Sequence, residues 1–208
     1  SSFCDRPSRV SNPMVKRIVP ARPEAPPAAA AHRTLPEGSA LGEFDAPVGP
    51  LALAVTPAGL ARLAFGPLEE TAEAPGPPRR EIPFAEHPIG AQVLAQLAQY
   101  FAGDRRAFEL PLDWTLTGGV QRTILQTLHA RVPCGRTVEY GELAVMSGRT
   151  LGASRLVGTV MGSNPIAIVV PCHRVVAADG LGGFGGGLET KRRLLTLEGV
   201  LQETLFDL

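Results

Sequence analysis

Residues 138–163 read "VEYGELAVMSGRTLGASRLVGTVMGS" and carry the clearest structural pattern in this 208-residue chain. They predict two short helices, over 138–148 and 153–163, joined by the turn "RTLG". Gly148 is expected to close the first helix, and Asn164-Pro165 to stop the second. Two short helices across a glycine-bearing turn are typical of a helix-turn-helix, a motif that binds DNA.

The second predicted helix has one face with almost no side-chain bulk. That face carries Arg155, Gly158, Thr159 and Gly162, and the opposite face carries Leu156, Val157, Val160 and Met161. A glycine inside a helix costs about 1 kcal/mol relative to alanine. Two glycines on one face therefore indicate that a large surface comes very close. That surface is either a packed helix or a narrow nucleic-acid groove.

The apolar run at 166–170 is expected to form a buried strand, and it leads into "PCHRVV" at 171–176. A base and a cation follow Cys172 directly, which favours the reactive thiolate form of a cysteine. On an extended backbone Cys172 and His173 would point to opposite sides. A direct bond between them therefore requires a turn, and a bridging water is the alternative.

A last helix is predicted over 188–202, after a loop at 178–187 that contains six glycines. Glu198 lies four residues after Leu194, so it falls inside the apolar stripe of this helix. Such a carboxylate could orient His173, although an ordinary glutamate at the edge of the stripe fits the same pattern. The basic run Lys191, Arg192 and Arg193 is expected to be a solvated helix face.

The first half predicts strands and one amphipathic helix. Residues 44–65 read as two strands around a turn at Thr56–Gly59, and 69–83 as a loop. A helix is expected from His87 and Pro88 to Phe101, followed by a short strand or extended linker at 108–114 and a further helix from Val120 to Val132. His87 is expected to be solvated or capping, His129 to lie on a helix face, and Cys134 to be unreactive.

Composition limits the possible functions. The chain has 20 basic and 20 acidic residues, so any contact with nucleic acid must be local. Residues 1–33 carry six basic and two acidic side chains in a low-complexity, proline-rich context, so 1–40 is expected to be a flexible, dispensable arm. Three scattered cysteines indicate a reducing compartment and no disulfide framework. We expect no metal, with Cys4, His32 and His87 as the remote exception, no cofactor and no membrane span.

Several motifs together resemble the O6-alkylguanine-DNA alkyltransferases, which are suicide methyltransferases of direct DNA repair. These motifs are "PCHRVV" with Asn-Pro eight residues before the cysteine, "TVEYGELA" (137–144), "RLVG" (155–158) and "GGLETKRRLLTLEG" (186–199). The resemblance is strong over 115–200 and weaker over 40–114. It implies an α+β protein: an N-terminal α/β domain (41–114) with a short, RNase H-like antiparallel sheet, then a mostly helical, winged-helix-like domain (115–208) with the helix-turn-helix.

The resemblance also implies a reaction. The protein would bind double-stranded DNA as a monomer, flip an O6-alkylguanine, or an O4-alkylthymine, out of the stack, and transfer the alkyl group irreversibly to Cys172. The family relays the proton of the thiol through water to the residues matched by His173 and Glu198. The expected location is the cytoplasm, at the nucleoid of a bacterium, or the nucleus of a eukaryote.

The resemblance assigns further roles residue by residue. Arg155 would fill the gap left by the flipped base, Tyr140 would donate a hydrogen bond to that base, and Asn164 would link the recognition helix to the active-site turn. The implied DNA contacts are Ala153, Ser154, Arg155, Gly158, Thr159 and Gly162. The implied substrate pocket is Met161, Phe184, Gly185 and Val175, with the carbonyl of Val175 reading the guanine amino group.

Three departures and three alternatives remain. The family often carries Tyr and then Ser or Ala where Phe184 and Gly185 stand, the turn between the two helices is one residue longer, and "GGVQRTIL" (118–125) replaces an aromatic-rich segment. A non-catalytic lesion sensor would lack Cys172. A fused regulator would need a cysteine-rich zinc domain. A Cys-His-Glu hydrolase is disfavoured by the helix-turn-helix and by the missing oxyanion motif.

Overall fold

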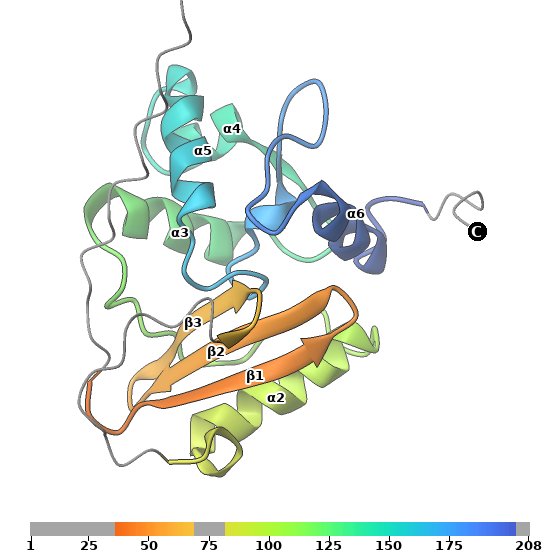
Figure 1. Ribbon diagram of the computed structural model, residues 1–208. Coiled ribbons are helices and arrows are strands. Elements are labelled where there is room, and N and C mark those ends of the chain that lie inside the picture. The colour runs from red at the N-terminus through yellow and green to blue at the C-terminus, as the bar shows by residue number, and fades with distance from the viewer. Residues whose placement is uncertain (1–35, 69–81, 203–208) are drawn as a thin grey trace, which may run out of the picture. The chain divides into compact units, whose positions relative to one another are not determined.

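A computed structural model describes residues 36–68 and 82–202 of the chain (Figure 1). The predictions made for residues 1–35, which include Cys4 and His32, and for most of the 69–83 loop lie outside the described residues. None of the described helices is long and apolar enough to span a membrane.

The N-terminal sheet has three antiparallel strands in the order β1-β2-β3, where two strands were predicted. They are β1 (Ala40–Ala46), β2 (Gly49–Thr56) and β3 (Gly59–Phe65). Strand β1 pairs with β2 from Ala40↔Val55 to Ala46↔Gly49, and its side chains are only alternately covered. The extra strand was missed because an edge strand with one covered face gives a weaker apolar signal than the buried β2.

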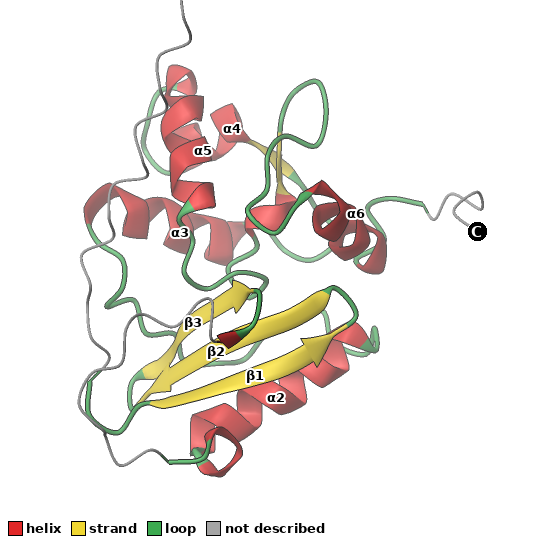
Figure 2. Ribbon diagram, in the orientation of Figure 1, coloured by secondary structure: helices red, strands yellow, loops and turns green. Residues whose placement is uncertain are grey.

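Helix α2 (Pro88–Phe101) packs along one face of this sheet (Figures 1 and 2). A short 3-10 turn, η1 (Phe84–Glu86), precedes it. The Nδ1 atom of His87 accepts a hydrogen bond from the Ile89 N–H at 3.2 Å, and a proline occupies the first turn. The helix and the capping role of His87 are therefore confirmed, although the histidine is buried rather than solvated.

The C-terminal domain is helical, as predicted. Its elements are α3 (Gly119–Arg131), α4 (Tyr140–Met146), η2 (Leu151–Ala153), α5 (Ser154–Gly162), η3 (Cys172–Arg174) and α6 (Leu188–Leu197), with β4 (Val138–Glu139) and β5 (Val175–Val176) forming a short parallel pair. Helices α4 and α5 pack together as a helix-turn-helix. The chain is therefore α+β, with a small N-terminal sheet domain and a helical C-terminal domain.

The predicted strand at 166–170 is wrong. The run is buried, but it forms a series of turns with one isolated bridge between Leu63 and Ile166. Leu63 of β3 bonds this segment twice, from its N–H to the Pro165 carbonyl (2.8 Å) and from its carbonyl to the Ala167 N–H (2.9 Å). Burial alone does not distinguish a strand from a buried turn, which explains the error.

Helix boundaries also differ from the predictions. Helix α4 starts at Tyr140 rather than at 138, because Val138 and Glu139 form β4. Helix α6 ends at Leu197 rather than at 202, because Gly199 takes a left-handed φ of 76° and terminates it. Of the two alternatives predicted for 108–114, the extended linker is confirmed, with a single bridge between Leu60 and Leu112. The Thr56 hydroxyl donates to the Asp113 carboxylate at 2.6 Å and fixes this linker to the sheet.

Candidate active site

Cys172 opens the short turn η3 immediately after Pro171. Its N–H bonds the Val170 carbonyl at 2.8 Å, and its side chain is buried, with 5% of the residue exposed. Ile168, four residues earlier, has a left-handed φ of 67°. A β-branched residue in this region is strained by about 1–3 kcal/mol, and such strain persists only where the surroundings impose it. The cysteine is therefore mounted on a rigid, tightly constrained turn.

Glu198 is the centre of a buried polar network. Its Oε1 accepts from the His173 Nε2 at 2.8 Å and from the Arg174 Nη2 at 2.9 Å, while its Oε2 accepts from the Arg174 Nε at 2.9 Å. The hydroxyl of Tyr100 donates to the same Oε1 at 2.8 Å. Glu198 lies at the C-cap of α6 rather than inside the helix.

The charges in this network follow from burial and hydrogen bonding. Burial alone would raise the pKa of Glu198, but hydrogen bonds from His173 and Arg174 hold that pKa at about 2. Burial lowers the pKa of His173 despite the neighbouring carboxylate. A neutral imidazole that donates from Nε2 leaves Nδ1 as an acceptor. That Nδ1 is buried and has no hydrogen-bond partner among the described residues.

The surroundings of Cys172 differ from the predicted thiolate-favouring set. Burial raises the pKa of the thiol, and this effect outweighs a hydrogen bond from Asn164 and the charge of Lys191, which both lower it. The predicted cation beside the cysteine, Arg174, is instead engaged by Glu198 and by the Val132 carbonyl at 2.7 Å. The thiol therefore needs a base to release its proton.

Asn164 connects the end of α5 to the active-site turn. Its Nδ2 donates to the Val170 carbonyl at 2.8 Å, and its Oδ1 accepts from the Ile166 N–H at 3.1 Å. One side chain thus fixes both ends of the strained segment before Cys172.

Lys191 was predicted to be solvated, and this is wrong, because its side chain is fully buried. Its Nζ donates to the carbonyls of Val175 (2.7 Å), Leu181 and Gly183 (3.3 Å). Burial lowers the pKa of Lys191 to about 8. A signal was available, because Lys191 lies three residues before Leu194 and therefore on the same stripe of α6 as Glu198.

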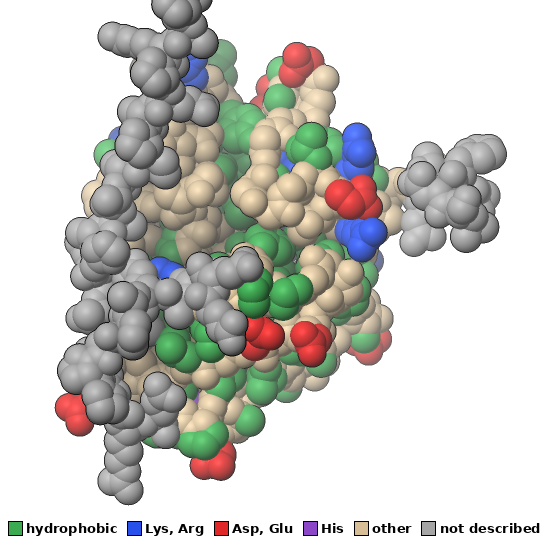
Figure 3. All heavy atoms as spheres, viewed as in Figure 1, with side chains coloured by type: hydrophobic (Ala, Val, Ile, Leu, Met, Phe, Trp, Pro, Cys, Tyr) green, Lys and Arg blue, Asp and Glu red, His purple; other side chains and the backbone are tan. Residues whose placement is uncertain are grey.

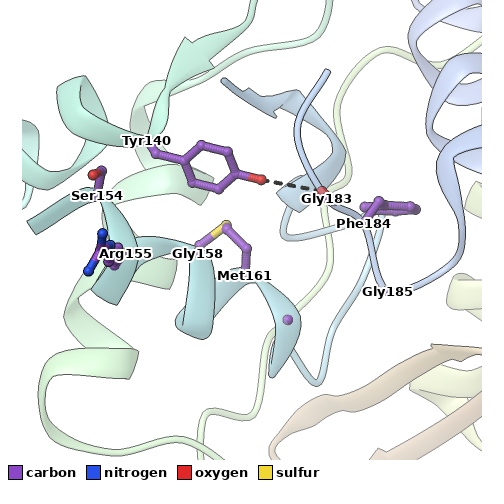
Figure 4. A pocket seen from close by; sticks show the side chains of 9 residues that line it. Tyr140, Ser154, Arg155, Gly158, Met161, Gly183, Phe184 and Gly185 are labelled. Atoms are coloured by element: carbon purple, nitrogen blue, oxygen red, sulfur yellow. Dashed lines mark hydrogen bonds between the residues drawn. The ribbon is translucent and has the colours of Figure 1, made fainter. Parts of the chain in front are cut away.

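A cavity of about 440 Å³ lies between α4, α5 and the glycine-rich loop (Figure 4). It is lined by Tyr140, Ser154, Arg155, Gly158, Met161, Gly162, Gly183, Phe184 and Gly185. Of these, sequence reasoning missed Gly183. The hydroxyl of Tyr140 donates to the Gly183 carbonyl at 3.2 Å across the cavity. Burial and the neighbouring Cys172 raise the pKa of Tyr140, so it remains a hydrogen-bond donor at neutral pH.

The remaining predicted residues are not among those that line this cavity. Cys172, His173, Glu198 and Val175 are buried, Asn164 and Ala153 are partly buried, and Thr159 is exposed. Within the described residues, no group of three His, Cys, Asp or Glu side chains is arranged to hold a metal ion.

The small-residue face of α5 is open. A Cβ atom added at Gly158 or Gly162 would meet no described atom within 4 Å. The alternative of tight helix packing against this face is therefore not supported, and an external surface can approach it. Of the residues placed on the opposite face, Val157, Val160 and Met161 are buried, whereas Leu156 is 41% exposed.

The comparisons with known proteins agree with this geometry. A family model described as "6-O-methylguanine DNA methyltransferase, ribonuclease-like domain" matches residues 41–114, and its partner described as "DNA binding domain" matches 119–200. A methylated-DNA–protein-cysteine methyltransferase of Mycobacterium tuberculosis is 42% identical over 168 residues, covering 79% of this chain and 96% of the relative. A Salmonella typhimurium protein of the same name is 49% identical over 109 residues, covering 51% of this chain and 61% of the relative.

Solved structures give the same result. A structure of Mycobacterium tuberculosis O6-methylguanine methyltransferase has 38% identity and a TM-score of 0.63, covering 77% of this chain and 92% of that one. Another structure, described as Mycobacterium tuberculosis OGT in complex with DNA, has 40% identity and a TM-score of 0.65, and the match covers 76% of this chain and 92% of that one.

Proposed function

Since the chain belongs to the 6-O-methylguanine DNA methyltransferase family, we propose that it repairs alkylated DNA by moving an alkyl group from guanine O6 to its own Cys172. The main support for this proposal is a buried cysteine on a rigid turn, next to the His173–Glu198 pair. The Nδ1 of His173 has no hydrogen-bond partner among the described residues. The reaction is a methylated-DNA–protein-cysteine methyl transfer, and it consumes the protein.

The open face of α5 is the proposed DNA contact. Gly158 and Gly162 let a groove come close to the backbone, and the exposed Arg155 at the start of the helix would enter the base stack. Lys and Arg side chains are mixed with Asp and Glu on the face shown in Figure 3 rather than gathered in one patch. Contact with DNA through a few residues suits a protein that has no net charge and must bind any DNA sequence.

The cavity is the proposed site of the flipped base. Its volume of about 440 Å³ falls within the range of small-molecule pockets, and Phe184 provides an aromatic wall for a purine. The hydroxyl of Tyr140, which donates to Gly183 in the free protein, would donate to the base instead. Tyr140 thereby assists the departure of guanine.

The chemistry is a single displacement. The thiol proton of Cys172 passes through a bridging water to the His173 Nδ1, and Glu198 stabilises the imidazolium through Nε2. The sulfur attacks the alkyl carbon, a C–S bond forms, and the C–O6 bond breaks. The departing guanine takes a proton that Tyr140 donates, the His173 imidazolium returns the thiol proton through water to the Tyr140 phenolate, and a thioether remains on Cys172. No step requires a cofactor, and no second turnover follows.

This function places the protein where genomic DNA is. For a bacterial chain that location would be the cytoplasm, and a monomer would suffice because one chain holds every proposed group. O4-alkylthymine would be a second substrate if the cavity accepts a pyrimidine.

A duplex oligonucleotide with one O6-methylguanine tests the proposal. Mass spectrometry of the digested protein should find one added methyl group on the Cys172 peptide, with at most one transfer per chain. Cys172→Ser should bind the same duplex without reacting, and Arg155→Ala should react more slowly to the same end point. An unmodified Cys172 peptide from folded protein would refute the transfer, and repeated turnover of a small ester would favour a hydrolase.

A further inference from the structure

Tyr100 extends from the N-terminal sheet domain into the Glu198 network. It lies in α2, is 2% exposed, and donates its hydroxyl to the Glu198 Oε1 at 2.8 Å. Glu198 is 98 residues further along the chain, at the end of α6. The sheet domain therefore places a hydrogen-bond donor next to the His173–Glu198 pair.

The position of this hydroxyl is fixed by the packing of its own domain. The ring of Tyr100 contacts those of Phe101 and Phe108, with centroids 5.2 Å and 5.3 Å away. Gln96, one turn earlier in α2, bonds the backbone of Glu109 twice, at 3.0 Å and 2.8 Å. Because the ring is held on two sides, the hydroxyl offers Glu198 a preformed partner.

The bond determines how the carboxylate is oriented. Arg174 donates to both oxygens of Glu198, and this bidentate pairing fixes the plane of the carboxylate. Tyr100 binds Oε1, the oxygen that also accepts from the His173 Nε2. With the Arg174 Nη2 and the Tyr100 hydroxyl both donating to it, Oε1 is kept in line with the imidazole, which in turn directs Nδ1.

We propose that Tyr100 is a positioning residue for alkyl transfer, through which the N-terminal sheet domain orients Glu198 and hence the His173 base. The inference rests on the proposed function, because it concerns the same His173–Glu198 pair. It gives the sheet domain a part in the reaction in addition to its part in the fold.

Tyr100→Phe removes the hydroxyl and keeps the ring. The single-turnover rate at saturating duplex should fall about 10-fold, the size expected when one hydrogen bond to a charged group is lost. The duplex concentration for half-maximal rate should not change, because Tyr100 is buried in α2 and does not belong to the open face of α5. Thr56→Val is the matched control: it removes a buried hydroxyl of the same domain that bonds Asp113 instead. Its transfer rate should equal that of the wild type.

A double-mutant cycle tests whether Tyr100 acts through Glu198. In a Glu198→Gln background, Tyr100→Phe should slow transfer by less than twofold, whereas a merely structural effect would again slow it about 10-fold. Equal slowing in both backgrounds, or a wild-type rate for Tyr100→Phe, would overturn the inference.

A spectroscopic measurement separates this inference from the proposed function. In wild-type protein labelled with ¹⁵N-histidine, the His173 Nε2 proton should exchange slowly with water because it is buried against Glu198. Tyr100→Phe should shift this signal and speed its exchange. If Tyr100→Phe does not fold, 3-fluorotyrosine placed at position 100 provides a stronger donor that should shift the same signal. An unmoved signal overturns the positioning role, whereas a wild-type protein that transfers no methyl group overturns only the proposed function.

Discussion

Lys191 is a buried cation that holds three carbonyls of two separate segments. Val175 follows the active-site turn, while Leu181 and Gly183 belong to the glycine-rich loop that lines the cavity. The Nζ atom also lies 6.0 Å from the centre of the Phe184 ring. A single side chain thus joins the turn that carries the nucleophile to the wall of the cavity.

Lys191→Met should loosen this connection, because the replacement keeps the apolar stem but has no donor. We expect hydrogen exchange at 181–184 to become at least 10-fold faster and methyl transfer to slow. Arg192→Met, at an exposed position of the same helix, should leave both unchanged. Wild-type exchange at 181–184 in Lys191→Met would show that other contacts hold the loop.

At the residue level, the sequence predicted side chains that belong to a motif and missed side chains that tertiary packing brings to the site. Cys172, His173 and Glu198 belong to recognisable motifs, and the structure joins the predicted pair His173 and Glu198 by a hydrogen bond. Arg174 was expected to be the cation beside the Cys172 thiolate and instead binds Glu198, and Tyr100 was missed because its partner is 98 residues away. Sequence spacing contains no information on which distant side chains share an oxygen.

The glycine-rich loop is shaped by close contacts with α4. Gly182 has a φ of 69°, and a Cβ atom there would lie 2.8 Å from the Tyr140 ring. Gly180, in the same loop, has open space where its Cβ would be. The geometry therefore requires a glycine at position 182 but not at position 180.

Gly182→Ala should displace the ring of Tyr140 and strain the backbone, which costs about 1 kcal/mol or more. We expect slower methyl transfer together with a lower melting temperature, measured by single-turnover kinetics and calorimetry. Gly180→Ala should match the wild type in both measurements. Equal behaviour of the two variants would mean that the loop is free to move away from α4.

Asn164→Ala should separate α5 from the active-site turn. The variant loses the bond to the Val170 carbonyl, which still accepts from the Cys172 N–H, and the bond to the Ile166 N–H, whose loss of a partner costs about 1–3 kcal/mol. It also loses the hydrogen bond that lowers the pKa of the Cys172 thiol, so that pKa should rise further. Labelling by iodoacetamide across a pH series would measure this change, and an unchanged midpoint would contradict it.

At the element level, the apolar periodicity of the sequence predicted the positions of the helices but not the conformation of irregular segments. Helices α2 and α3 follow a clear 3–4 spacing. The structure buries Val93, Leu97 and Tyr100 of α2 and Ile124, Leu125 and Leu128 of α3. The apolar run at 166–170 has no period that separates a strand from a buried turn, and the turn is imposed by Leu63 of a distant strand. The early end of α6 could have been predicted, because Gly199 is a typical C-terminal glycine.

Across the whole molecule, Glu198 makes stability depend on pH. Its folded-state pKa of about 2 lies below the ordinary value of 4.5. Its contribution is therefore complete above pH 4.5, and it is lost as the pH falls towards 2. This shift corresponds to a stabilisation on the order of 3 kcal/mol.

Urea unfolding at a series of pH values would measure this contribution. The wild type should lose stability steeply between pH 4.5 and 2, and Glu198→Gln should start lower and lose less over the same interval. Parallel curves for the two proteins would assign the acid sensitivity to other carboxyl groups.

The near-complete burial of Cys172 has a consequence after the reaction is over. The sulfur must accept a methyl group in a turn where 5% of the residue is exposed, and overpacking of this kind costs about 1–3 kcal/mol. A spent molecule would thus differ from a fresh one in its thermal transition as well as in its mass. A sample that has repaired lesions should therefore show a second melting step. The amplitude of that step should grow with the number of lesions removed.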